Sequence, residues 1–170
     1  MIHGKQLSLC LLAVALIALT AVPALADPLE SGLVSVGDRY AVTTIHGQAG
    51  AWVSGSWVVS TADLQLVAQV TFVGSRNVLF RIVSGTIQLD DKVYSIVAAG
   101  WRGYYNRDTN TCAYQGPATA PDGQRAFFVI HGRDTLPVQQ GTYMHMWSDF
   151  RDENGILWRI DLHTYRFKIN

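Results

Sequence analysis

Apolar and polar residues alternate along residues 63–72, and this is the clearest structural pattern in the chain. Apolar side chains occupy every second position there, namely Leu64, Leu66, Ala68, Val70 and Phe72, and most residues between them are polar. A period of two is typical of a β-strand with one buried face and one exposed face. The pattern therefore predicts a strand whose apolar face, Phe72 included, contributes to a core.

The next segment predicts an antiparallel meander with an irregularity in its second strand. Residues 78–89 and 93–101 have the composition of two further strands, with a tight turn between them. The apolar positions change parity between Ile82 and Ile87, and Ser84-Gly85 lies between these two residues. We therefore expect a β-bulge or a sharp bend at Ser84-Gly85.

Shorter strands are expected over residues 40–46, 51–59 and 124–131, with 132–141 as a connection. Residues Arg102–Gly123 have no apolar periodicity and hold three Gly and two Pro. They predict a loop of about 20 residues, a length that is uncommon unless the loop is functional or mobile.

The last two strands form a predicted hairpin whose register can be argued. Glu153-Asn154-Gly155 suits a three-residue loop, in which the Gly takes the left-handed conformation of a type I turn followed by a G1 bulge. Such a loop pairs residue 152 with 156, and one face of the hairpin is then largely apolar. The alternative, a two-residue Asn-Gly loop, would shift the pairing by one residue and mix polar and apolar groups on both faces. The second face comprises Tyr143, His145, Trp147 and Asp149 on one strand and Arg159, Asp161, His163 and Tyr165 on the other.

This second face holds the main candidate binding residues, Tyr143, His145, Trp147, Asp161, His163 and Tyr165. Directly opposed side chains have Cβ atoms about 4.5–5.5 Å apart, so His145 and His163 can share a zinc or copper ion, with Asp161 as a third ligand. Alternatively, the three aromatic side chains form a platform for a small molecule or a glycan, or line a barrel lumen. A solvated sheet face without a ligand is the third interpretation.

The first 26 residues are typical of a secretory signal peptide. A basic start precedes an apolar run over residues 7–19 and the small-x-small sequence Ala24-Leu25-Ala26. We expect cleavage after Ala26, which places the mature protein outside the cell or in the cell envelope. An uncleaved membrane anchor is the alternative. Residues 27–39 are expected to be a flexible lead-in and residues 40–170 a single domain.

Charge and cysteine content narrow the class of partner. Of the 13 Lys and Arg residues, Lys5 lies in the leader. The mature chain therefore has 12 basic and 13 acidic residues, and its net charge is −1. Nucleic acid and anionic membranes need a basic patch, so neither is expected as a partner, and membrane contact is expected only through the leader. Cys112 is the one cysteine after the leader, which predicts a buried thiol, a reactive thiol or an intermolecular disulfide.

No catalytic or cofactor-binding motif is recognisable in the chain. We expect an all-β domain, a single antiparallel up-and-down barrel or barrel-like meander of about seven to nine strands. The expected function is a non-enzymatic binding module without a cofactor, which uses the aromatic and histidine-rich face or the 102–123 loop. Its partner would be a small molecule, a glycan or an envelope protein. The alternatives are a self-assembling structural protein of the envelope and, third, a secreted enzyme.

Overall fold

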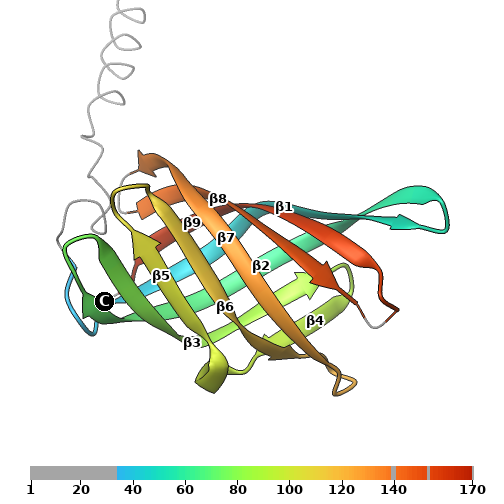
Figure 1. Ribbon diagram of the computed structural model, residues 1–170, viewed down its shortest axis with the longest axis horizontal. Coiled ribbons are helices and arrows are strands. Elements are labelled where there is room, and N and C mark those ends of the chain that lie inside the picture. The colour runs from blue at the N-terminus through green and yellow to red at the C-terminus, as the bar shows by residue number, and fades with distance from the viewer. Residues whose placement is uncertain (1–33, 139–140, 153, 170) are drawn as a thin grey trace, which may run out of the picture.

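The computed structural model describes residues 34–138, 141–152 and 154–169, so the predicted signal peptide lies outside the described residues. Within these residues, nine antiparallel strands form one sheet that closes into a ring, which we call the barrel (Figure 1). The expectation of an all-β, barrel-like antiparallel sheet is confirmed. The strands are β1 Arg39–Val53, β2 Ser56–Val73, β3 Asn77–Leu89, β4 Lys92–Ile96, β5 Arg102–Asn106, β6 Thr111–Thr119, β7 Arg125–Val138, β8 Gly141–Arg151 and β9 Leu157–Lys168.

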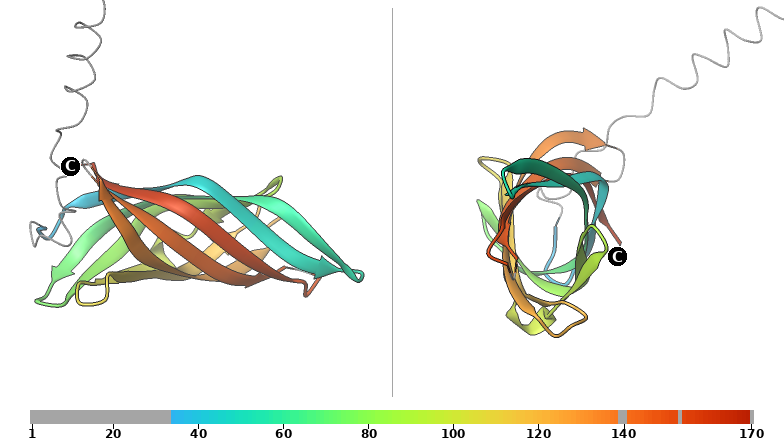
Figure 2. Two further views of the ribbon diagram at one scale, coloured as in Figure 1. Left: turned by 90° about the horizontal axis from the view of Figure 1, so that it is seen from above. Right: turned by 90° about the vertical axis from the view of Figure 1, so that its right-hand side faces the viewer.

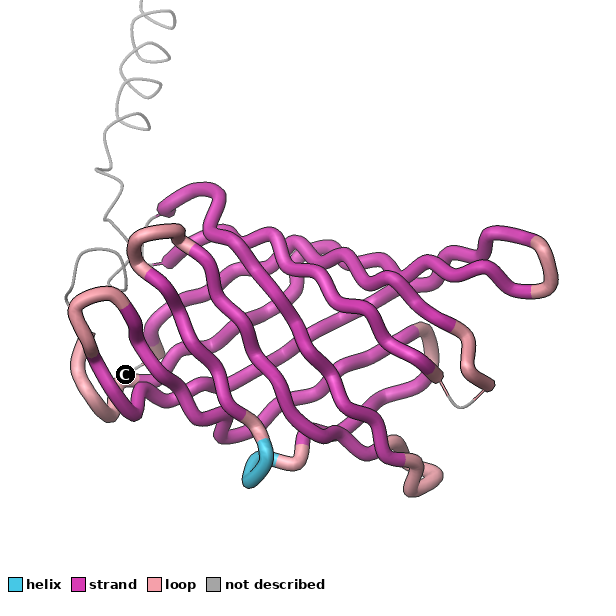
Figure 3. The backbone as a smooth tube through the Cα atoms, viewed as in Figure 1, coloured by secondary structure: helices cyan, strands magenta, loops and turns pink. Residues whose placement is uncertain are grey.

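The strands follow one another around the barrel in chain order, and β9 returns to pair with β1. β4 and β5 share one place in the wall, because each pairs with β3 on one side and with β6 on the other. The short 3₁₀ turn η1, Ala98–Gly100, separates them. The end-on view in Figure 2 shows the closed ring, and the tube in Figure 3 shows η1 as the helical segment in the wall. Within the described residues, no helix is long and apolar enough to cross a bilayer.

The interior of the barrel is filled by apolar side chains from all nine strands, as a small barrel requires. The predicted alternation in β2 holds from Leu64 to Val70, whose side chains are all buried at the even positions. The expectation for Phe72 is wrong, because its side chain is 53% exposed. Val70 pairs with Phe80 and Phe72 with Leu79, so the ladder shifts between Val70 and Phe72 and the side-chain parity changes there.

The irregularity expected in β3 is confirmed, and it lies at Val83, one residue before the predicted Ser84-Gly85. Ile82 pairs with Ala68 and Ser84 with Val67, which leaves Val83 without an opposite residue in β2. This bulge reverses the parity of the strand, so that Ile82 and Ile87 both point into the core.

The prediction of a loop over Arg102–Gly123 is wrong, because most of it forms β5 and β6. The alternation of apolar and polar residues is not visible in this segment because glycines occupy buried positions. Gly103 and Gly116 are buried, and a Cβ on Gly116 would lie 2.4 Å from the Trp101 ring. Pro117 in β6 lies opposite the gap where η1 interrupts the neighbouring strand. Its carbonyl accepts a hydrogen bond from Val97 N at 3.0 Å on that side. Since the N–H and C=O of one strand residue point to the same side, the missing N–H falls at this gap.

Two other predicted boundaries also differ from the structure. Residues 132–138 continue β7 instead of forming a connection, because they pair with β8. Gly132 packs closely within this strand, since a Cβ there would lie 2.8 Å from Cys112 Sγ. Residues 51–59 form the tip of the β1–β2 hairpin, and Ser54-Gly55 makes its turn with φ of 50° and 82°. Figure 1 shows this hairpin projecting beyond the end of the barrel.

The barrel also encloses an ion pair among its buried side chains. Arg166 Nη2 donates to Asp134 Oδ2 at 2.8 Å, and the two side chains are 0% and 2% exposed. The Arg166 guanidinium lies 4.8 Å from the centre of the Tyr105 ring. A paired and stacked guanidinium is the arrangement in which proteins tolerate a buried charge.

Candidate binding site on the outer sheet face

The register predicted for the last hairpin is confirmed. His145 pairs with His163, Trp147 with Asp161, and Tyr143 with Tyr165. Asp152 N donates to the Ile156 carbonyl at 3.1 Å, and Gly155 has a φ of 75°, as the predicted turn requires. Glu153, the first residue of that turn, lies outside the described residues.

The candidate residues lie on the outside of the barrel, which the sequence left open. Their strand neighbours Met144, Met146 and Leu162 point inward and are at most 2% exposed. We call this outer surface the His–aromatic face; it comprises Tyr143, His145 and Trp147 on β8 and Asp161, His163 and Tyr165 on β9. It does not line the lumen, so a ligand can reach it directly from solvent.

The polar centre of the His–aromatic face is a carboxylate between two imidazoles. His145 Nε2 lies 3.1 Å from Asp161 Oδ2, and His163 Nε2 lies 3.8 Å from Asp161 Oδ1. The His145 and His163 rings stack with centroids 5.3 Å apart. All three side chains are at least 40% exposed, so water and ions have access to every one of the three groups.

This arrangement is close to the geometry of a metal site. One ligand atom from each of His145, Asp161 and His163 can be chosen so that all three lie within 4.8 Å of one another. Tetrahedral zinc with bonds of about 2.0–2.2 Å places neighbouring ligand atoms about 3.3 Å apart. The 3.1 Å separation between His145 and Asp161 already matches, and the other separations need side-chain rotations of exposed groups. A metal held by three protein ligands keeps a further position open to solvent.

Two further histidines lie beside the His–aromatic face, and the sequence alone did not place them there. The His46 ring on β1 stacks on His163 with centroids 6.4 Å apart, and the His131 ring on β7 stacks on Trp147 at 6.1 Å. All four histidines of the described residues thus lie on four adjacent strands. His46 reaches the outer face because the ladder between β1 and β9 shifts between Thr44 and His46, which leaves Ile45 unpaired with β9.

The aromatic side chains of the His–aromatic face flank the polar centre. The Tyr143 and Tyr165 rings lie 5.5 Å apart at one end, and the Trp147 ring lies 5.6 Å from His145. Tyr143 and Trp147 are more than two-fifths exposed. Exposed rings beside polar groups offer an apolar surface for the organic part of a ligand.

Cys112 is not part of any exposed site. Its thiol is free and buried inside the barrel, and burial raises its pKa to about 12. A thiol with that pKa is protonated at physiological pH and does not react as a nucleophile. An intermolecular disulfide at Cys112 would require the barrel to open.

Comparisons of this chain with protein-family models, with curated proteins and with solved structures gave no match.

Proposed function

We propose that the mature protein is an exported, non-enzymatic binding module that holds a divalent transition-metal ion on its His–aromatic face. The observation that carries this proposal is the convergence of His145, Asp161 and His163, whose candidate ligand atoms lie within 4.8 Å of one another. The three residues stand on two paired strands of a closed sheet, so the backbone holds their spacing without a ligand.

Ligand chemistry points to zinc or copper among the biological cations. Imidazole nitrogen suits zinc, copper and nickel, whereas calcium and magnesium prefer oxygen ligands alone. The exposed position of the site leaves a coordination site for a solvent-borne ligand, and the neighbouring Tyr143 and Trp147 rings would contact its organic part. A metal chelate of a small molecule, glycan or peptide is then a natural partner.

The direct test is isothermal titration of the purified protein with zinc chloride and, separately, with a copper(II) salt. The protein must carry no polyhistidine tag. We expect saturable binding of one ion per chain, and a weakening in His145→Ala or His163→Ala at least as large as the roughly 10–100-fold loss caused by removing an outer partner of a ligand.

His131→Ala is the matched control, because His131 lies on the same outer surface but stacks on Trp147 outside the triad. Its affinity for zinc should equal that of the wild type. The proposal fails if neither metal binds saturably, or if His131→Ala loses as much affinity as His145→Ala.

A second candidate function, self-association, is favoured by the projecting β1–β2 hairpin. Among the described residues, the ladder of β1 with β9 ends at Gly50, and that of β2 with β3 starts at Ala62, so both edges of the tip lack a neighbouring strand. Trp52 and Trp57 pair across the tip and are 68% and 49% exposed. Free edges pair readily with other strands, and the same edge of a second copy is a self-complementary partner.

Light scattering after size-exclusion chromatography distinguishes this candidate from the first. Self-association through the hairpin predicts a dimer that dissociates in the double variant Trp52→Ser/Trp57→Ser. Trp147→Ser, which removes an exposed indole from the barrel wall, is the control and should leave the dimer intact. A wild-type monomer at high micromolar concentration would exclude this candidate and leave the metal proposal unaffected.

A further inference from the structure

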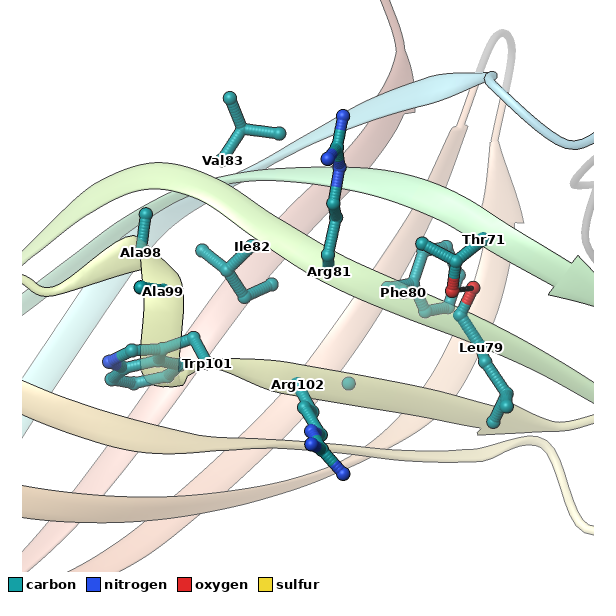
Figure 4. A pocket seen from close by; sticks show the side chains of 11 residues that line it. Thr71, Leu79, Phe80, Arg81, Ile82, Val83, Ala98, Ala99, Trp101 and Arg102 are labelled. Carbon is teal, nitrogen blue, oxygen red and sulfur yellow. Dashed lines mark hydrogen bonds between the residues drawn. The ribbon is translucent and has the colours of Figure 1, made fainter.

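The barrel wall is interrupted between β3 and the place shared by β4 and β5. β3 pairs with β5 through Asn77–Arg81 and with β4 through Thr86–Leu89, so within the part of the chain that the structure describes no strand lies beside residues 82–85 on that side. The Val83 bulge of β3 lies at this point, and η1 lies between β4 and β5 in the opposite part of the wall. The close-up in Figure 4 shows β3 on one side of this opening and η1 with Trp101 on the other.

The interruption forms a pocket of about 670 Å³ that is open to solvent. Phe80, Ile82 and Trp101, which are at most 3% exposed, connect it to the core, and Leu79 and Val83 form part of its exposed rim. The volume is within the range of about 300–1,000 Å³ that is typical of small-molecule sites. The lining is thus mostly apolar and adequate for an organic ligand of moderate size.

Trp101 is held in place by local structure, so the pocket is a built feature. Its indole Nε1 donates a hydrogen bond to the Pro117 carbonyl. Gly116 lies beneath the ring, and a Cβ there would lie 2.4 Å from two of its atoms. The glycine therefore makes room for an indole that closes the pocket toward the core.

The charge of the pocket has one sign. Arg81 and Arg102 line it and are paired directly across β3 and β5, and the described lining includes no carboxylate. In Figure 4 the two side chains extend to opposite sides of the opening, and Arg81 Nε donates to Gln69 Oε1 at 2.9 Å. Both side chains are exposed, and Arg81 would exchange its two hydrogen bonds to Gln69 for bonds to an anion placed between the arginines.

We infer that this wall pocket binds an amphipathic organic anion, with its apolar body against Ile82 and Trp101 and its carboxylate, sulfate or phosphate group between Arg81 and Arg102. An anion at that place gains charge-assisted hydrogen bonds from both guanidinium groups. A neutral apolar ligand would gain none of these bonds, and a cation would be repelled by both arginines. The inference does not depend on the metal proposal, because the pocket lies on β3 and β5 and the His–aromatic face on β8 and β9.

The test is titration of ¹⁵N-labelled protein with decanoate, monitored by the amide shifts of Val83, Ala99 and Gly103. Decanol and decylammonium serve as neutral and cationic probes with the same chain length. We expect saturable shifts at these three amides with decanoate, and at least about tenfold weaker binding of the other two probes, the effect of losing a charge-assisted hydrogen bond.

Two variants separate the charge from the cavity. Arg81→Gln/Arg102→Gln should weaken decanoate binding about tenfold or more without lowering the melting temperature, whereas Arg125→Gln, an exposed arginine on β7, should leave the affinity unchanged. Ala98→Phe should block the pocket for all three probes.

The inference is overturned if decanoate fails to bind saturably, if decanol binds equally well, or if the double arginine variant keeps the wild-type affinity. It is also overturned if decanoate shifts amides elsewhere and leaves Val83, Ala99 and Gly103 unmoved. If the double arginine variant melts far below the wild type, Arg102→Gln alone takes its place. This single variant must likewise bind decanoate more weakly than the wild type.

Discussion

The ion pair inside the barrel gives the largest stability effect that we predict from a single polar substitution. Arg166 and Asp134 are 0% and 2% exposed and meet at 2.8 Å. Removing one partner of such a pair leaves the other charge buried without its counter-ion, which costs about 3–5 kcal/mol. Asp134→Asn should therefore lower the free energy of unfolding by about 3–5 kcal/mol.

Urea and thermal unfolding at pH 7 measure this effect. For a domain of this size, 1 kcal/mol corresponds to about 3–4 °C, so the melting temperature should fall by about 10–20 °C. Asp108→Asn is the matched control: Asp108 meets Arg76 at 3.3 Å, but these side chains are 56% and 76% exposed. An exposed pair of this kind contributes below about 1 kcal/mol.

A double-mutant cycle with Arg166→Met separates the ion pair from the packing of the two side chains. The methionine keeps the length of the buried chain and removes its charge. The double variant should be more stable than the sum of the two single losses predicts, by up to about 3 kcal/mol. The reasoning is refuted if Asp134→Asn costs no more than Asp108→Asn, or if the two buried substitutions are additive.

Three further effects follow from other contacts. Cys112, whose pKa burial raises to about 12, should resist a thiol reagent at pH 8 in the native protein and react once denaturant is added; fast native labelling would contradict this. Gly116→Ala should lower stability by about 1–3 kcal/mol, because its Cβ would lie 2.4 Å from Trp101; unchanged unfolding in urea would be the contrary result. Burial opposes ionisation of Asp38, but hydrogen bonds from Lys168 and Ser35 hold its pKa below the usual 3.8. Since its folded pKa is lowered, its stabilisation is present at neutral pH and is lost as the pH falls through that pKa. The difference in melting temperature between wild type and Lys168→Met should therefore shrink below about pH 4, and a difference that grows in acid would refute it.

The last hairpin could be predicted from the sequence because several constraints agree there. Gly155 fixes the turn, and only one register separates apolar from polar side chains over the full length of both strands. That register already places His145 opposite His163 and brings Asp161 beside them. The same logic located the bulge in β3, where the apolar parity changes between Ile82 and Ile87.

The strands β5 and β6 could not be predicted in this way. Their inward positions include Gly103 and Gly116, which do not count as apolar side chains in the sequence although they face the core. These positions have no room for a side chain, because the Tyr114 and Trp101 rings occupy the space beside them. Pro117 also favoured the wrong prediction of a loop, because the gap beside η1 that accommodates it forms only in the folded barrel.

The complete candidate site was also beyond the sequence. His46 adjoins His163 only because the barrel closes and β1 pairs with β9, a contact between strands more than 100 residues apart. A shift in the β1–β9 ladder then brings His46 to the outer face. The wall pocket likewise depends on two features that come together only in the folded barrel, the bulge in β3 and the η1 turn between β4 and β5.

The most direct test of the metal-binding account is the zinc X-ray absorption spectrum of untagged protein that is loaded with one equivalent of zinc and then dialysed. We predict zinc retained at one ion per chain, with two imidazole ligands and additional oxygen ligands at about 2.0–2.2 Å. His145→Ala, which should bind zinc at least about tenfold more weakly, should retain less zinc after the same dialysis. Loss of the zinc on dialysis, or a spectrum with oxygen ligands alone, would contradict the account.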